Sequence, residues 1–134
     1  MAMTKQYLSI DGTWNVLMCY DVQTEDNLRE VLGYMLSLGA SDEQVRSAAE
    51  TLGWWNGGIT FSSFDDRMSV VAIGRAVTDT EFYNTIDHEI DHIQDHVANY
   101  YGVRLGTEEA AYLQGYIGGR LWKNVIDQIM SKYL

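Results

Sequence analysis

Residues 78–102 read TDTEFYNTIDHEIDHIQDHVANYYG. Thr78 and Glu81 have the spacing of a capping box, which satisfies the free amides at the start of a helix, and Gly102 is a typical helix terminator. Between these ends, apolar side chains recur every three or four residues, as on one side of a helix. The pattern therefore predicts one long amphipathic helix, whose apolar side is Phe82, Ile86, Ile90, Ile93 and Val97.

Two histidines lie four residues apart within this stretch, as His88 and His92 of the run HEIDH. In a helix this spacing sets two side chains one turn apart, about 6 Å along the axis and roughly 40° around it. The apolar residues fall roughly 120–200° from His88, so both imidazoles face away from the core. We interpret them as a pair that can reach one metal ion, and two solvated surface histidines are the alternative.

Composition limits the class of protein. The chain has 134 residues, of which 46% are hydrophobic, so we expect a single domain over 1–134. Its formal net charge of -10 repels phosphate backbones and anionic lipids, so neither nucleic acid nor a membrane is an expected partner. Cys19 is the only cysteine and is expected to be a buried thiol. Because no secretory signal or spanning segment is recognisable, we expect a soluble cytoplasmic protein.

The rest of the chain divides into short apolar runs separated by turn residues. A strand is expected over 14–22, followed by helices that begin near Thr24 and at the capping box of Ser41 and Gln44. The runs ITFSSF and MSVVAIGR indicate an antiparallel hairpin, and a last helix is expected from Glu108 towards Tyr133, kinked or interrupted near Gly118. The predicted order is β-α-α-β-β-α-α, which is an α+β fold.

Zn²⁺ is the cofactor that this histidine pair favours. Imidazole nitrogen binds zinc at about 2.0–2.1 Å, and a catalytic site adds one more protein ligand and a water. Glu89 lies within about 60° of His92 around the helix, so its carboxylate can take a proton from that water as a general base. Other divalent ions also accept imidazole and carboxylate ligands, so the choice of zinc follows from ligand type alone.

A third ligand is available in the segment TEEAAYLQGY, which follows the Gly102 and Gly106 turn. An antiparallel helical hairpin there would bring Glu108 or Glu109 opposite the histidines. The alternative for both glutamates is stabilisation of the first turn of a helix by its dipole.

HEIDH followed by Glu108-x-x-Ala111 resembles the gluzincin branch of the zincin metallopeptidases, in particular the very small minigluzincins. The resemblance covers about 57–117 and implies a zincin-like minimal domain, with a small antiparallel sheet or hairpin packed on the active-site helix. It also implies that Glu108 is the third metal ligand, with Glu109 in reserve. Residues 68–74 would then supply an edge strand for an extended substrate.

The chain departs from the gluzincin pattern four residues after Glu108. Where many gluzincins have an aspartate or asparagine that orients a histidine, this chain has Tyr112. Tyr112 and Tyr116 are candidates for supporting a ligand or for stabilising an oxyanion, and aromatic packing between helices is the alternative. His96 is a further candidate for supporting a ligand or for stabilising an oxyanion. The alternative for His96 is that it replaces Glu108 as the third metal ligand.

These residues predict a small zinc-dependent metallopeptidase that hydrolyses a peptide bond through a zinc-bound water activated by Glu89, with a peptide or protein as substrate. A catalytically inactive, peptidase-like zinc-binding or interaction protein is the second hypothesis. An acidic helical interaction domain without a metal is the third.

Overall fold

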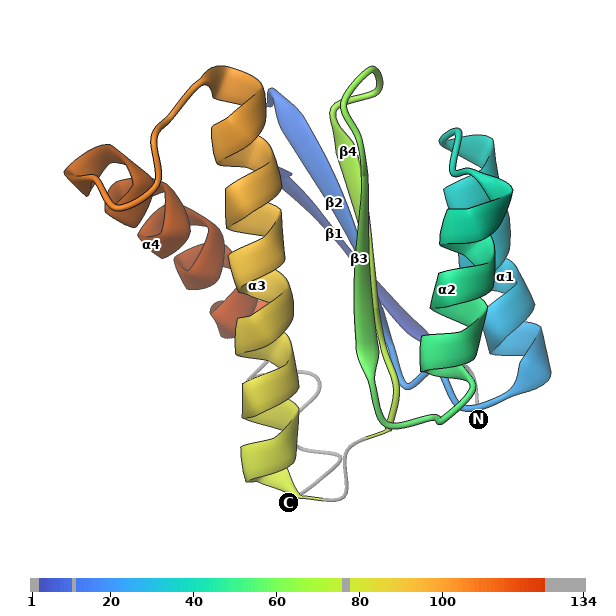
Figure 1. Ribbon diagram of the computed structural model, residues 1–134. Coiled ribbons are helices and arrows are strands. Elements are labelled where there is room, and N and C mark those ends of the chain that lie inside the picture. Colours follow the sequence, from blue (N-terminus) through green and yellow to red (C-terminus); the bar gives the residue numbers. More distant parts are fainter. Residues whose placement is uncertain (1–2, 11, 76–77, 125–134) are drawn as a thin grey trace. The chain divides into compact units, whose positions relative to one another are not determined.

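The computed structural model describes residues 3–10, 12–75 and 78–124 (Figure 1). The chain divides into two compact units, Met1–Ala76 and Val77–Leu134. The first unit holds a four-stranded sheet and two helices, and the second holds two helices, so the predicted α+β class is confirmed. In order, the elements are β1 (Thr4–Ile10), β2 (Trp14–Tyr20), α1 (Glu25–Ser37), α2 (Asp42–Leu52), β3 (Gly58–Ser63), β4 (Met68–Ile73), α3 (Asp79–Tyr101) and α4 (Glu108–Asn124).

The sheet is mixed, with strand order β1-β2-β4-β3. The predicted hairpin is confirmed, because β3 pairs antiparallel with β4, but β4 also pairs in parallel with β2. The expectation of an antiparallel sheet therefore fails at the β2–β4 pair. The prediction that 68–74 supplies an edge strand is also wrong, since β4 has neighbours on both sides. Among the described residues, β3 is the terminal strand at this end of the sheet.

Strand β1 was not predicted from the sequence. It pairs antiparallel with β2 in a hairpin whose register runs from Thr4 opposite Tyr20 to Ile10 opposite Trp14. Its side chains alternate between half-buried and exposed positions, and only Ile10 is fully buried. A strand with so few apolar residues lacks the alternation by which strands are recognised in sequence.

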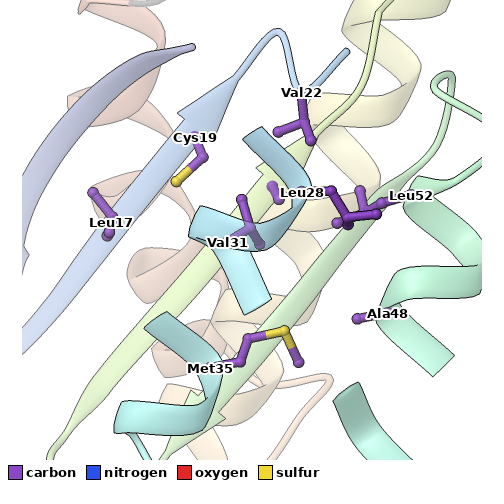
Figure 2. Close-up of a cluster of buried hydrophobic side chains, with 9 residues drawn as sticks. Leu17, Cys19, Val22, Leu28, Val31, Met35, Ala48 and Leu52 are labelled. Carbon is purple, nitrogen blue, oxygen red and sulfur yellow. The ribbon is translucent and has the colours of Figure 1, made fainter. Parts of the chain in front are cut away.

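The core of the first unit lies where α1 and α2 cover one face of the sheet (Figure 1). Leu17 and Cys19 of β2 point to this face, as the two-residue period of a strand requires, and meet the apolar side of each helix (Figure 2). The cluster consists of Leu17, Cys19, Val22, Leu28, Val31, Met35, Ala48, Leu52 and Ala72. Burial confirms the expectation for Cys19, and it raises the pKa of the thiol to about 12.

Side-chain caps fix the starts of three helices. The predicted capping box of α2 is present in both directions: the Gln44 amide donates to Ser41 Oγ at 3.1 Å, and the Ser41 amide donates to Gln44 Oε1 at 2.8 Å. Thr24 caps α1 by accepting a bond from the Asn27 amide, and Thr78 caps α3 by accepting a bond from the Glu81 amide at 3.1 Å. These caps confirm the helix starts expected from sequence.

In the second unit α4 follows α3 after a short turn (Figure 1). Gly102 ends α3 with a φ of 71°, and Gly106 has a φ of 80°, values that favour glycine. Gln94 of α3 donates from Nε2 to the Ala110 carbonyl of α4 at 3.3 Å.

Helix α4 is continuous through Gly118 and Gly119 to Asn124, so the interruption considered there is absent. Residues 125–134, which carry the predicted end of this helix, lie outside the described residues. Over residues 3–10, 12–75 and 78–124, no helix is both long enough and apolar enough to cross a bilayer.

Candidate metal centre

The imidazoles of His88 and His92 lie together on the exposed side of α3. Their Nε2 atoms are 3.1 Å apart, and their ring centroids are 4.7 Å apart with the planes at 84°. The buried side chains of α3 lie on the opposite side of the helix, as the sequence predicted. Both Nε2 atoms therefore lie close together on the solvent-exposed side of α3.

This separation fits two ligands of one zinc ion. Two nitrogens that are each about 2.0–2.1 Å from a zinc ion and 3.1 Å from each other subtend about 95–102° at the metal. The tetrahedral angle of about 109° needs a separation of about 3.3 Å, so the rings would part by only about 0.2 Å. The pair is thus already arranged to hold a metal ion.

A hydrogen bond between the rings also accounts for the distance. One Nε2–H can donate to the lone pair of the other Nε2 at 3.1 Å, provided that the accepting imidazole is neutral. This arrangement and metal coordination use the same nitrogen atoms, so the two exclude each other. Metal analysis distinguishes them.

Glu89 is buried, with only 2% of its surface exposed. It lies about 100° around α3 from His88 and about 60° from His92, at the border between the histidines and the apolar side. Phe82, at about 120°, is its apolar neighbour on the wheel and is fully buried. The burial of Glu89 was not predicted, although its position on the wheel beside Phe82 was a signal for it.

His96 continues the row of imidazoles one turn beyond His92. The centroids of these two rings are 6.3 Å apart, compared with 4.7 Å for His88 and His92, and the His96 side chain is half-buried. Burial is the main cause that lowers the pKa of His96, the charge of His92 lowers it further, and the charge of Asp95 opposes both. A neutral imidazole beside the pair suits the supporting role considered for His96.

Glu108 and Glu109 are exposed in the first turn of α4. The start of α4 contacts α3 at Gln94, which lies about 120° around α3 from His88, through the carbonyl of the buried Ala110. Glu108 lies about 160° around α4 from Ala110 and so faces away from the buried side of its helix. Within the described ranges, no three His, Cys, Asp or Glu side chains are gathered as a metal site. The structure thus brings together the two histidines and leaves both glutamates apart from them.

The two tyrosines of α4 have different surroundings. Tyr112 is 75% exposed, so the alternative of aromatic packing between helices does not hold for it. Tyr116 is half-buried, and the Arg120 guanidinium lies 3.2 Å from the centroid of its ring, as in a cation–π contact. The roles of both tyrosines at the site stay predictions.

The chemistry of this site follows from its own residues. A row of imidazoles, a buried carboxylate beside it and a strongly acidic chain together favour a divalent cation. In comparisons with protein-family models, curated proteins and solved structures, the chain finds no match.

Proposed function

We propose that this protein is a small zinc-dependent metallopeptidase in which His88 and His92 bind the metal and Glu89 is the general base. The observation that carries the proposal is the 3.1 Å separation of the two Nε2 atoms, close to the spacing of two zinc ligands. Exposure of both rings leaves the metal position accessible to a substrate.

Glu89 supplies the acid–base chemistry. Its carboxylate accepts a proton from the attacking water and returns it to the leaving amine. A bound zinc ion contributes a Lewis acid that polarises the scissile carbonyl.

The third ligand in this proposal is Glu108, with Glu109 in reserve. Since both are exposed and Glu108 faces away from the buried side of α4, binding through either requires that the first turn of α4 rearranges. This requirement makes the two glutamates the part of the proposal that is most open to a direct test.

The first experiment measures metal in protein purified without added metal and without a metal-chelating column. We expect about one zinc per chain, as for a single tetrahedral site. Replacement of either His88 or His92 by Gln should remove it, and Glu89→Gln should retain it. Protein that contains no metal and does not take up zinc in a titration would overturn the proposal.

The second experiment measures cleavage of a broad peptide library by the zinc-loaded protein. Glu89→Gln should abolish cleavage by removing the base. Asp91→Asn is a matched control, because Asp91 is an exposed carboxylate on the same helix. Hydrolysis that persists in Glu89→Gln would remove Glu89 from the mechanism.

Glu108→Gln and Glu109→Gln form a matched pair for the third ligand, since both are exposed and adjacent in α4. Loss of a ligand weakens zinc binding far more than loss of a surface charge does. We expect Glu108→Gln to weaken it and Glu109→Gln to leave it nearly unchanged. The reverse result would assign the ligand to Glu109.

A second candidate function is a zinc-binding or interaction protein without peptidase activity. It is favoured by the position of Glu108, which leaves two gathered ligands where a catalytic zinc site has three. One zinc per chain, unaffected by either glutamate substitution and accompanied by no cleavage, would select this function.

A further inference from the structure

A groove runs between α2 and strand β3 in the first unit. Its first hollow, of about 350 Å³, lies against Glu43, Gln44, Ser47, Ala48, Ile59 and Phe61. A second hollow, of about 290 Å³, lies against Leu38, Gln44, Phe61, Ser63, Phe64 and Asp65. Because Gln44 and Phe61 line both, the hollows adjoin each other along β3.

The two hollows differ in polarity. Met35, Ala48 and Ile59 give the first an apolar floor, and Glu43 is its one ionisable side chain. In the second, Phe64 is 42% exposed beside the carboxylate of Asp65. The first hollow therefore suits an apolar side chain of a ligand that carries a positive charge close by. The second hollow suits a basic side chain.

Charge identifies the occupant. Both ionisable side chains that line the groove, Glu43 and Asp65, are acidic, and no lysine or arginine lines either hollow. A chain of net charge -10 also attracts cationic ligands from a distance and opposes its own self-association.

Shape identifies the class of ligand. The hollows follow β3, which has six residues and spans about 20 Å. In an extended peptide, alternate side chains point to the same side about 6.8 Å apart, so an apolar and a basic side chain two residues apart can enter adjoining hollows. We propose that the α2–β3 groove binds an extended segment of a partner protein in which an apolar residue and a basic residue lie two positions apart, so that both side chains point to the groove.

The test uses a fluorescently labelled hexapeptide in which one valine and one lysine lie two positions apart among serines. Its counterpart has glutamate in place of the lysine. Fluorescence anisotropy of the full chain should show saturable binding of the first and none of the second up to about 1 mM. Raising NaCl from about 0.05 M to about 0.5 M should weaken binding, because exposed charges are screened.

A pair of double variants separates the groove from net charge. Each exposed ion pair is worth about 1.4- to fivefold in affinity, so Glu43→Gln with Asp65→Asn should weaken binding by about two- to 25-fold. Glu25→Gln with Glu50→Gln is the matched control: it changes net charge equally, and Glu25, like Glu43, lies in a first helical turn. The control should bind like the natural chain.

Ser47→Arg fills the first hollow from an exposed helical position that tolerates arginine, and it should abolish binding. The proposal is overturned if both peptides bind equally, if the two double variants weaken binding equally, or if no binding saturates. A concentration-dependent dimer that Ser47→Arg abolishes would assign the groove to a second copy and overturn it too.

Discussion

Gly74→Ala is expected to destabilise the first unit because the chain passes too close to residue 74. A Cβ built at Gly74 would lie 2.5 Å from the Trp55 carbonyl oxygen and 2.7 Å from its carbonyl carbon, so the loop before β3 would have to retreat by about 0.5 Å. The loop is held in place, because the Arg75 amide donates to that same oxygen at 2.6 Å and the Gly74 amide donates to the Gly57 carbonyl at 2.8 Å.

The expected cost follows from these contacts. Overpacking costs about 1–3 kcal/mol, and weakening one backbone hydrogen bond costs about 0.5–1.5 kcal/mol. Alanine also lowers the conformational entropy of the unfolded chain, which raises the free energy of unfolding by about 0.4–1 kcal/mol and offsets part of this cost. We expect Gly74→Ala to lower the free energy of unfolding by about 2 kcal/mol.

Gly33→Ala is the matched control, with an opposite expected sign. Gly33 is exposed in the middle of α1, and a Cβ there would meet no atom within 4 Å. Alanine should therefore raise the free energy of unfolding by about 0.5–1 kcal/mol. Urea unfolding followed by tryptophan fluorescence and circular dichroism measures both variants. Equal stabilities for Gly74→Ala and Gly33→Ala would refute the reasoning.

The remaining predictions concern the histidine pair, the buried thiol and one surface ion pair. Zinc at about 100 times its dissociation constant should stabilise the protein by about 2.7 kcal/mol and raise its melting temperature by about 10 °C, whereas a chelator or His92→Gln should abolish the rise. Cys19, whose pKa burial raises to about 12, should react with a thiol reagent at pH 8 only after unfolding, so rapid labelling of the native protein would contradict its burial. Glu30 accepts bonds from Lys5 at 2.7 Å and Tyr34 at 2.6 Å, which lower its pKa. Their contribution to stability is present above the ordinary glutamate pKa of about 4.3 and is lost as the pH falls below it. The stability advantage over Glu30→Gln, smaller than the effect of Gly74→Ala, should therefore shrink between neutral and acid pH in urea unfolding, and an advantage that stays constant would count against the bond.

The sequence predicts the elements whose signals are local. Periodic apolar residues and turn or cap residues give four helices, whose starts near Thr24, Ser41, Thr78 and Glu108 agree with the structure. The hairpin of β3 and β4 follows from two apolar runs around a polar turn. Strand β1 is not predicted from the sequence because its buried side carries the polar residues Thr4 and Gln6. The Asp-Gly pair that follows it is nevertheless a hairpin signal.

Long-range pairing is what local signals do not specify. Nothing in the run 68–73 shows that it enters the sheet between β2 and β3, because a parallel neighbour is chosen by the whole fold. The same limit applies to the metal centre. His88 and His92 are one helical turn apart, so their spacing in the sequence alone brings their Nε2 atoms close together. The position of Glu108, by contrast, depends on how α4 packs on Gln94 of α3.

The parallel pairing of β2 with β4 has a consequence for synthesis on the ribosome. The residues of β2 that pair with β4 have partners 53 positions later in the chain, as Leu17 has Val70. These partners are synthesised only after β2 has been made. At about 5–20 residues per second, this interval lasts about 3–10 s, during which the uncharged segment WNVLMCY has one edge without hydrogen-bond partners. A newly made chain in that interval is a natural client for chaperones that bind extended apolar segments, and slower translation would lengthen its exposure.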